Sequence, residues 1–530
     1  MMRLLALLFL LISTSFVDSY KILFYTNLFG HSHVKMLGAA ADVLTEAGHD
    51  VTVLLSVLES NLRNRTSLKS TKKTIIIEQA ADIKELMEEM FAYMAEMWTA
   101  DNGNPLVILN AQETEMMIKT CGGQCKKVLS EPGLIEKLKA EKFDLAITEP
   151  FDMCAYALFE AINIRAHVGI LSSCRYDHVS RTIGQPIAAS YVPSGESTMG
   201  DRMTMSERFW NFLQSFTADY FFSVVGDAEF EIAKTVVPIK RSWRETLPEA
   251  TFILSNQIAL LDFPAPTFDK IVPIGGLSVK TDKEHLKLDE KWSKILDIRK
   301  KNVFISFGSV ISSKDMPPEF KASFLKVFAS MPDTTFIWKY ENASDPLVEH
   351  LDNVYLGEWL PQNELLADPR LSVFVTHGGL GSVIELAMMG KPAVMVPLFA
   401  DQGRNANMLK RHGGAAVLDK NGLADAELVR RTLEHVIAEE SFRRSALRLA
   451  EMLRNQPTSP QETLLKYVEF AARFGKLPSL DNYGRHQSYI EYFFLDIIAI
   501  SLLVITITIY ILYTILQFSF RKLSRKSKQE

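Results

Sequence analysis

The stretch FVTHGGLGSVIELA, residues 374–387, decides the fold class of this 530-residue chain. An apolar strand ends at Thr376, a glycine-rich turn follows, and a helix continues to Met389. Backbone amides at such a turn, together with the positive end of the helix, can hold a diphosphate. Glu385 lies one turn into the helix, where its carboxylate could accept ribose hydroxyls. Because any α/β protein can place glycines in a tight turn, the neighbouring sequence has to decide the function.

Two polar clusters flank this turn, and each follows a predicted strand. Residues 358–362 read EWLPQ, and residues 397–405 read PLFADQGRN. The carboxyl ends of parallel strands meet at one edge of a sheet, and open α/β sheets bind their ligands there. The three clusters therefore predict a single site for a nucleotide-sugar.

Alternating strands and helices occupy most of the chain in two series. In the first, a strand at 21–26, a helix at 34–47 and a strand at 50–56 form one βαβ unit. Further elements are predicted at 143–148, 153–161 and 167–171, and the second series of strands at 302–307, 335–338, 353–356, 371–375, 392–396 and 415–418. Continuous apolar strands between helices indicate parallel sheets covered on both faces. We therefore expect an α/β fold of two doubly wound, Rossmann-like domains that face each other across a cleft.

Composition sets the domain boundaries. We expect an N-terminal domain at 20–265, a linker at 266–288 and a C-terminal domain at 289–480. The linker holds prolines and glycines before a charged stretch, as interdomain connections do. Helical stretches at 83–98 and 203–235 are rich in Met and aromatic residues. This pattern favours core packing, with an apolar binding pocket or a surface lying on a membrane as the alternatives.

Both ends of the chain carry membrane-targeting signals. Residues 1–19 have the charged, apolar and small-residue order of a secretory signal peptide. Residues 493–520 are a predicted transmembrane helix, and the basic tail at 521–530 is expected in the cytosol by the positive-inside rule. The large middle part is then expected in a lumen, where Asn64 and Asn342 are glycosylation sequons. Lys526 and Lys528 resemble a dilysine retrieval signal, which favours the endoplasmic reticulum membrane over a generic basic flank.

Composition also removes several classes of function. The 58 basic and 63 acidic residues give a net charge of −5, so no basic surface excess indicates a nucleic-acid partner. Cys121 and Cys125 have no second Cys or His pair at metal-ligand spacing, which disfavours a zinc site and leaves a local disulfide or buried thiols. No Asp-x-Asp triplet occurs, so we expect no metal and no cofactor.

Three motifs together carry a family resemblance: Trp359-Leu-Pro-Gln362, the turn that begins Thr376-His-Gly-Gly, and Asp401-Gln402. Together they resemble the signature of the UDP-glycosyltransferases. The whole chain, including both terminal segments, is similar to the UDP-glucuronosyltransferases of invertebrates and of nematodes in particular. The resemblance implies the two-domain GT-B fold, with the acceptor in the N-terminal domain and the UDP-sugar in the C-terminal domain.

The resemblance also implies roles for individual side chains. Trp359 would stack on uracil, Gln362 would contact the uracil and ribose, and Glu385 would bind the ribose. Asp401 and Gln402 would hold hydroxyls of the donated sugar. The residues expected to face the diphosphate are Ser309, Thr376, His377, Gly379, Gly381 and Ser382.

By the same resemblance, His33 is the general base that removes the proton of an acceptor hydroxyl. Imidazole titrates near neutrality, and a helix N-terminus favours its neutral, proton-accepting form. His31, two residues away, is the competing candidate. After the strand at 143–148 the family has an Asp, whereas this chain has Glu149, which would stabilise the imidazolium of His33. Asp152 is the alternative carboxylate, and a plain helix cap is the alternative role of Glu149.

These assignments predict a UDP-glucuronosyltransferase or UDP-glycosyltransferase of the endoplasmic reticulum. It would move a sugar from UDP-glucuronic acid or UDP-glucose to a hydroxyl of a small lipophilic acceptor, with inversion in a single displacement. Gly381 stands where many vertebrate members have Asn, so one diphosphate contact has to come from elsewhere. The other hypotheses are a UDP-glucosyltransferase of the same family and a catalytically silent nucleotide-sugar-binding subunit, and the family also admits a homo-oligomer. A dinucleotide-dependent oxidoreductase would need G-x-G-x-x-G after the first strand, which residues 27–33 lack.

Overall fold

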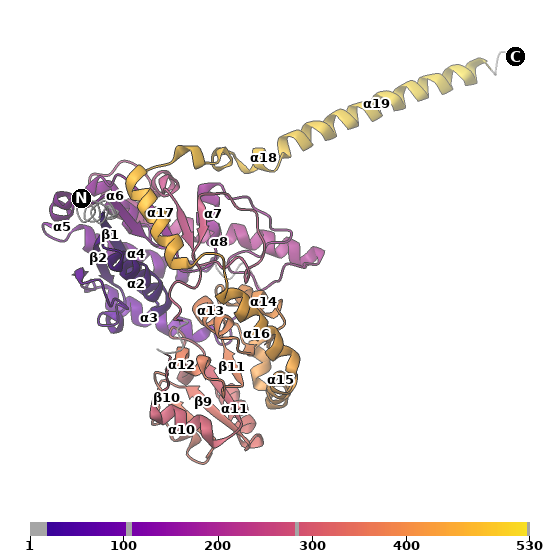
Figure 1. Cartoon of the computed structure of the whole chain (residues 1–530). Helices are drawn as coiled ribbons and strands as arrows, with labels where there is room; N and C mark the ends of the chain where they lie inside the picture. The colour runs from indigo at the N-terminus through magenta and orange to yellow at the C-terminus, as the bar shows by residue number, and fades with distance from the viewer. Residues whose placement is uncertain (1–18, 102–108, 281–285, 527–530) are drawn as a thin grey trace, which may run out of the picture.

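The computed structural model describes residues 19–101, 109–280 and 286–526, and it contains two β-sheets with helices on both faces (Figure 1). The N-terminal sheet has the strand order β3-β2-β1-β4-β5-β6-β7, and the C-terminal sheet has the order β10-β9-β8-β11-β12-β13. The strands of the first sheet are β1 (Lys21–Leu28), β2 (Asp50–Val57), β3 (Lys73–Ile77), β4 (Leu145–Thr148), β5 (His167–Leu171), β6 (Ile253–Ser255) and β7 (Ile271–Pro273). Those of the second are β8 (Lys301–Ser306), β9 (Thr334–Lys339), β10 (Val354–Gly357), β11 (Val373–Thr376), β12 (Ala393–Met395) and β13 (Ala415–Val417).

The strand order confirms the predicted pair of doubly wound domains. In each sheet the chain starts in the middle, adds two strands on one side and then the remaining strands on the other. Adjacent strands are parallel throughout the described sheets. Ile22, Leu23 and Phe24 in the central strand β1 are fully buried, since helices cover both faces of the sheet. The switch points of the two sheets, β1/β4 and β8/β11, are where such folds bind ligands.

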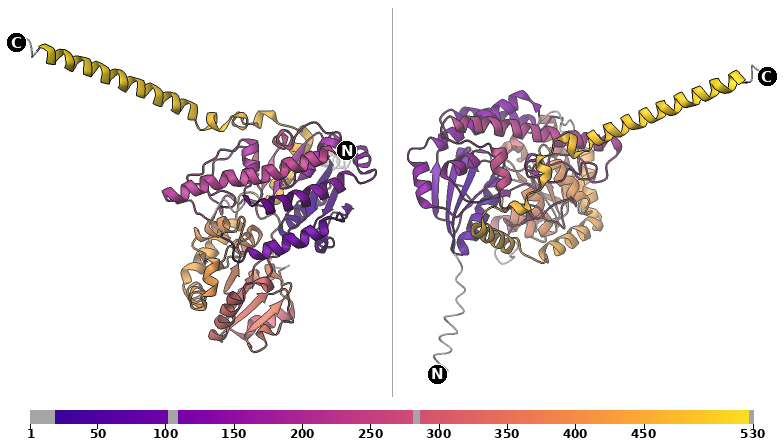
Figure 2. Two further views of the ribbon diagram at one scale, coloured as in Figure 1. Left: turned by 180° about the vertical axis from the view of Figure 1, so that it is seen from behind. Right: turned by 90° about the horizontal axis from the view of Figure 1, so that it is seen from above.

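Helices fill the connections between the strands, as the further views in Figure 2 show. The N-terminal domain contains α2 (His31–Glu46), α3 (Ile83–Glu96), α4 (Ala111–Leu129), α5 (Leu134–Glu141), α6 (Cys154–Ile162), α7 (Asp177–Ile183), α8 (Met205–Lys234) and α9 (Trp243–Thr246). The following segment contains α10 (Glu290–Ile298), α11 (Pro318–Ser330), α12 (Gln362–Ala367), α13 (Leu380–Met389), α14 (Gln402–Lys410), α15 (Ala426–Ala438), α16 (Glu440–Arg454), α17 (Pro460–Phe474), α18 (Tyr489–Tyr492) and α19 (Leu495–Lys526).

The chain passes between the two domains twice. β7 lies inside the range 266–288 that the sequence assigned to the linker, because its three residues extend the N-terminal sheet beside β6. The first crossing therefore begins after β7. α17 lies inside the range 289–480, yet its buried residues Leu464 and Val468 pack in the same core as Ile22 and Phe24 of β1. The second crossing is consequently the short segment between α16 and α17 (Figure 1).

The two Met-rich and aromatic stretches pack only partly as core helices. In α3, Met87 and Met90 are buried, but Trp98, just beyond the helix, reaches the C-terminal domain. Its ring lies 5.0 Å from that of Phe307 between centroids, and its Nε1 donates to the backbone oxygen of Ser312 over 3.3 Å. The second stretch, α8, is buried in its C-terminal half, whereas its start exposes a group of large apolar side chains: Met205, Phe209, Trp210 and Phe212.

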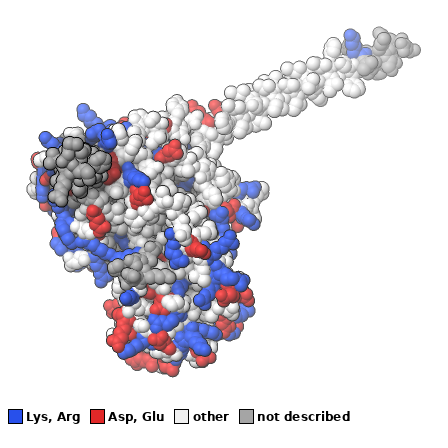
Figure 3. Space-filling view, viewed as in Figure 1, with Lys and Arg blue, Asp and Glu red and all other residues white. Residues whose placement is uncertain are grey.

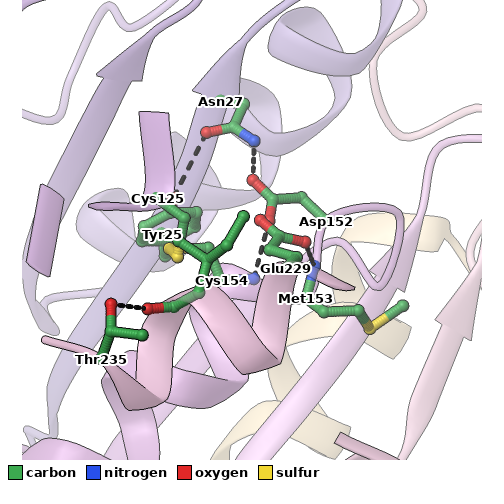
Figure 4. The surroundings of a disulfide bond; sticks show 9 residues. Tyr25, Asn27, Cys125, Asp152, Met153, Cys154, Glu229 and Thr235 are labelled. Atoms are coloured by element: carbon green, nitrogen blue, oxygen red, sulfur yellow. Dashed lines mark hydrogen bonds between the residues drawn. A yellow bond between two sulfur atoms is a disulfide. The ribbon is translucent and has the colours of Figure 1, made fainter. Parts of the chain in front are cut away.

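Of the two alternatives that the sequence left open for Cys121 and Cys125, the local disulfide is wrong, and Cys121 is a buried thiol. Cys125 of α4 forms a disulfide with Cys154 at the start of α6, with 5.4 Å between the Cα atoms (Figure 4). Cys121 remains a buried thiol one helical turn away. The sequence separation concealed this pairing, because α4 and α6 are brought together only when they pack on the same face of the sheet.

The C-terminal helix α19 extends away from both domains (Figure 1). Its segment Leu495–Lys522 is long and apolar enough to cross a membrane and is not buried anywhere in the fold. Figure 3 shows an uncharged surface along this helix and basic residues near its far end. The helix is compatible with a membrane anchor. The predicted signal peptide lies, except for its last residue, outside the described residues.

Candidate active site

A cleft of about 510 Å³ lies between the two domains at the carboxyl ends of their strands. Side chains of both domains line it, including Phe29 and His33 from the N-terminal half. The predicted donor-site residues that line it are Ser309, Trp359, Gln362, His377, Gly379, Gly381, Ser382, Glu385, Asp401 and Gln402. The fold therefore brings together motifs that are up to 370 residues apart in the chain (His33 to Gln402 spans 402 − 33 = 369 positions).

His33 and Glu149 meet because their strands are neighbours. His33 lies in the first turn of α2, directly after β1, and Glu149 directly follows β4, which pairs with β1. His33 Nδ1 lies 2.8 Å from Glu149 Oε2. The imidazole is 25% exposed and the carboxylate 8% exposed, so solvent and substrate reach the histidine but hardly the acid. With Nδ1–H donating to the carboxylate, Nε2 is left as the proton acceptor.

Two further residues, which the sequence analysis missed, hold this carboxylate in place. Ser172, the first residue after β5, donates its backbone N–H to Glu149 Oε1 over 2.9 Å, and its hydroxyl also reaches both Glu149 and His33 Nδ1. The hydroxyl of Tyr176 donates to Glu149 Oε1 over 3.0 Å. Their position after β5, the strand next to β4, was the only signal in the sequence.

The charges of His33 and Glu149 shift the pKa of each other. Burial alone would lower the pKa of His33, but the negative charge of Glu149 and the hydrogen bond to it outweigh burial, so the pKa of His33 is raised. Burial likewise works against ionised Glu149, and the charge and hydrogen bond of His33 nevertheless hold the pKa of Glu149 below its ordinary value. The geometry thus favours an imidazolium–carboxylate pair once a proton has been taken up.

The alternative residues for both roles point elsewhere. The ring of His31 packs edge-on against Trp359, with centroids 5.2 Å apart, and burial lowers its pKa. The carboxylate of Asp152 accepts from the side chain of Asn27 and, over 2.7 Å, from the backbone N–H of Cys154 (Figure 4). Asp152 therefore supports the start of α6, and Glu149 is the carboxylate that contacts His33.

The glycine-rich turn forms an open cradle at the start of α13. Gly378 has φ +93°, and a Cβ atom at Gly308 would lie 2.7 Å from the ring of His377, so both positions require glycine. No side chain caps the start of α13, which leaves its first N–H groups for a ligand. Burial lowers the pKa of His377 to about 4, so at neutral pH its ring is a neutral hydrogen-bonding partner.

One predicted contact is not supported by the position of its residue. Thr376 was expected to face the diphosphate, but it is completely buried and does not line the cleft. As the last residue of β11 it points into the sheet packing, and its hydroxyl lies 3.4 Å from His377 Nδ1. We therefore assign Thr376 to supporting the His377 ring instead.

Hydrogen bonds and an ion pair across both domains surround Glu385, where the sequence analysis expects the ribose. Gln362 Nε2 donates to Ser382 Oγ over 3.0 Å and to Glu385 Oε2 over 2.6 Å. Lys35 of α2 forms an ion pair with the other oxygen of Glu385. Trp359 is 54% exposed, which leaves an indole surface that a base can cover.

Asp401 and Gln402, where the sequence analysis expects the donated sugar, line the same cleft as His33. Asp401 accepts a hydrogen bond from Ser173 Oγ over 3.2 Å, and its charge is one of those that raise the pKa of His33. The side-chain oxygen of Gln402 accepts a hydrogen bond from the backbone N–H of Leu398 over 2.8 Å. The –NH₂ group of the Gln402 amide is therefore left for a ligand. Ala400, just before this pair, has φ +50°, a conformation that residues with a side chain rarely adopt, and it lines the cleft.

A smaller cavity of about 30 Å³ continues from His33 into the N-terminal domain. Its lining is mostly apolar and includes Phe29, Met90, Met117 and Phe151, so the Met-rich stretch supplies a pocket wall as well as core. Among the described residues, one group of potential metal ligands comes together, Cys125, Cys154 and Glu229. Both of its sulfur atoms are committed to the disulfide.

Two facing doubly wound domains with a phosphate cradle in one and a His–carboxylate pair in the other define the architecture of nucleotide-sugar glycosyltransferases. Solved structures share this fold: a Phytolacca americana enzyme, UGT2, complexed with UDP-2-fluoro-glucose and pterostilbene gives a TM-score of 0.57 at 18% identity, covering 86% of this chain and 100% of that one. The glycosyltransferase VinC in complex with dTDP gives 0.53 at 18% identity, covering 86% and 100%.

Sequence comparison narrows the class to one family. The family model described as "UDP-glucoronosyl and UDP-glucosyl transferase" matches residues 21–530, and the chain belongs to this family. The Caenorhabditis elegans protein ugt-48, which carries a provisional UDP-glucuronosyltransferase name, is 26% identical and covers 97% of each chain. Mouse UDP-glucuronosyltransferase 2B17 is 27% identical and covers 99% of this chain and 98% of its own.

Gly381 offers a direct test of the diphosphate cradle. A Cβ atom there would meet only Ser32 Cβ at 3.9 Å, an ordinary contact, so a larger side chain fits. Gly381→Asn would place an amide at the start of α13 and is expected to tighten UDP binding about 3- to 10-fold through one added hydrogen bond. Titration calorimetry with UDP measures this effect, and Gly381→Leu, which fills the space without an amide, is the control. Equal affinities for both variants would place the diphosphate elsewhere.

Proposed function

We propose that this chain transfers a glucuronosyl or glucosyl group from a UDP-sugar to a hydroxyl of a small lipophilic acceptor. One observation carries the proposal: the His33–Glu149 pair faces Asp401 across a cleft whose other wall is the glycine-rich cradle. Phe29, Phe151 and Phe222 line the large cleft together with His33 and provide an apolar wall that suits a lipophilic acceptor. The donor nucleotide is assigned to the C-terminal domain, with uracil on Trp359 and the ribose on Glu385.

In the proposed reaction, His33 Nε2 takes the proton of the acceptor hydroxyl while the oxygen of that hydroxyl attacks the anomeric carbon of the sugar. Glu149 stabilises the resulting imidazolium. The bond from the anomeric carbon to the diphosphate breaks in the same step, and UDP leaves with its new charge facing the N–H groups of α13 and the ring of His377. Attack from the face opposite the leaving group inverts the anomeric centre, so an α-linked donor gives a β-glycoside.

The first test removes the base. His33→Ala is expected to lower kcat by about 10²- to 10⁴-fold, while UDP affinity changes little. Turnover of UDP-glucuronic acid and UDP-glucose with a pool of phenols in microsomes containing the chain measures the effect. In the matched variant His31→Ala, the change should fall mainly on the donor KM, because His31 packs against Trp359. Undiminished kcat in His33→Ala would refute the assignment of the base.

A second test uses pH. Only neutral His33 can accept a proton, so kcat/KM should rise with pH through the raised pKa of His33 and then level off. Glu149→Gln removes the charge that raises this pKa and leaves burial, which lowers it. In Glu149→Gln the rising part of the kcat/KM profile should therefore move to lower pH. The plateau value of kcat/KM should fall, because Gln stabilises the imidazolium less than Glu does. Asp152→Asn is the control, and if that substitution moved the rising part instead, Asp152 would be the supporting carboxylate.

We also propose a type I arrangement in the endoplasmic reticulum membrane, with both domains in the lumen and α19 as the anchor. The basic residues after the apolar segment and the dilysine-like pair support this orientation. The sequons at Asn64 and Asn342 are exposed on the surface, as glycosylation requires. A mass decrease on treatment with an N-glycosidase, lost in Asn64→Gln/Asn342→Gln, supports the lumenal placement, and an unglycosylated chain in microsomes would argue against it.

A further inference from the structure

Arg175 occupies a place in the cleft that the proposed reaction does not use. It lies on the loop between β5 and α7, two residues beyond Ser173 and next to Tyr176. Ser173 donates to Asp401, the proposed sugar ligand, and Tyr176 donates to Glu149, the partner of the base. Two residues of extended chain span at most about 7 Å, so Arg175 is anchored close to the reacting end of the cleft. Arg175 is one of the residues that line the cleft, and it also lines a neighbouring cavity that includes Phe263 and Arg404.

The guanidinium of Arg175 is held rigidly by one edge only. Its Nε donates to Asp177 Oδ1 over 3.1 Å, and Asp177 is fixed in turn by Ser194 Oγ at 2.6 Å and the N–H of Gly195 at 2.9 Å. The side chain of Arg175 is 10% exposed. Its two terminal nitrogens make no hydrogen bond to any residue that the structure describes. Asp177 balances the charge of Arg175, and the two terminal nitrogens remain as donors that match a carboxylate.

The neighbouring acids do not occupy those donors. Asp177 is committed to three hydrogen bonds, and Asp401 is paired with Ser173. Glu196 also lines the cleft, but its carboxyl has no hydrogen-bonding partner among the described residues. Burial, followed by the charges of nearby acids, raises the pKa of Glu196 to about 8, so it is largely uncharged at neutral pH. The ion pair with Asp177 therefore leaves the two terminal nitrogens of Arg175 as hydrogen-bond donors for a ligand.

We propose that Arg175 binds a substrate carboxylate in the cleft and thereby selects glucuronic acid over glucose as the donated sugar. This inference rests on the proposed function. A guanidinium presents two parallel N–H groups that match the two oxygens of a carboxylate, whereas the hydroxymethyl group of glucose gains much less from them. The proximity of Asp401 favours the donor sugar as the source. A carboxylate on the acceptor is the other source with the same chemistry.

The experiment compares the wild-type full-length chain with Arg175→Met in microsomes, using UDP-glucuronic acid and UDP-glucose with one neutral phenol. Arg175→Met is expected to lower kcat/KM for UDP-glucuronic acid by about 10- to 100-fold. The loss with UDP-glucose should not exceed about threefold. Arg175→Lys, which keeps the charge but not the fork, should fall between them. Arg165→Met, the same charge change at an exposed site, is the control for net charge.

A second arm separates the two sources of the carboxylate. With UDP-glucose as donor, a phenol carrying a carboxylate is compared with its neutral methyl ester. Arg175→Met could lower turnover of the acidic phenol but not of its methyl ester, with the ratio of kcat/KM for the two donors unchanged. That result would assign the carboxylate to the acceptor and overturn the donor selection. If Arg175→Met lowered kcat/KM equally for all substrates, or for none, Arg175 would only shape its loop. Either result would overturn the proposal.

Direct binding keeps this inference distinct from the proposed function. Affinities of UDP-glucuronic acid and UDP-glucose are measured by calorimetry on the detergent-solubilised wild type and on Arg175→Met. The wild type could transfer neither sugar but bind UDP-glucuronic acid more tightly than UDP-glucose, with the difference lost in Arg175→Met. In that case the proposed function is refuted and the inference on Arg175 stands. If the wild type transfers sugar and Arg175→Met binds both donors with the wild-type ratio, donor selection by Arg175 fails and the proposed function stands.

Discussion

The adjacency of β1 and β4 is the constraint on which the rest of the active site depends. These parallel strands end side by side, so the residues that follow them, His33 and Glu149, meet without any special loop. β5 continues the sheet and adds Ser172 at the same edge, where it holds the carboxylate of Glu149. Ser172 and Tyr176 hold Oε1 of Glu149, while Oε2 of the same carboxylate contacts His33.

A second set of contacts brings the two domains into register. Lys35 of α2 pairs with Glu385 of α13, and the indole of Trp98 is inserted into the C-terminal core. The ion pair lies beside α13 and the indole lies beside β8, so the two contacts fix the relative position of the domains at separated points. The distance from His33 to the donor cradle thus depends on interdomain packing as much as on either domain alone.

Strand periodicity predicted all six strands of the C-terminal sheet and four of the seven in the N-terminal sheet, and the family resemblance predicted the pairing of His33 with Glu149. Three features were beyond their reach. The Cys125–Cys154 disulfide depends on how α4 and α6 pack, the burial of Thr376 depends on which way the last residue of β11 points, and the path of α17 depends on a tertiary contact. Ser172, Tyr176 and Arg175 carry no motif, because a loop residue is recognisable only once its neighbours in space are known.

The return of α17 to the N-terminal core has a mechanical consequence. The domains are joined by two segments of backbone, one after β7 and one between α16 and α17. Together these two segments form a hinge between the domains. Such a pair leaves one easy axis of rotation and resists twisting about any other. Opening of the cleft would then move the glycine-rich turn along a fixed arc, so that each closure returns it to the same alignment with His33.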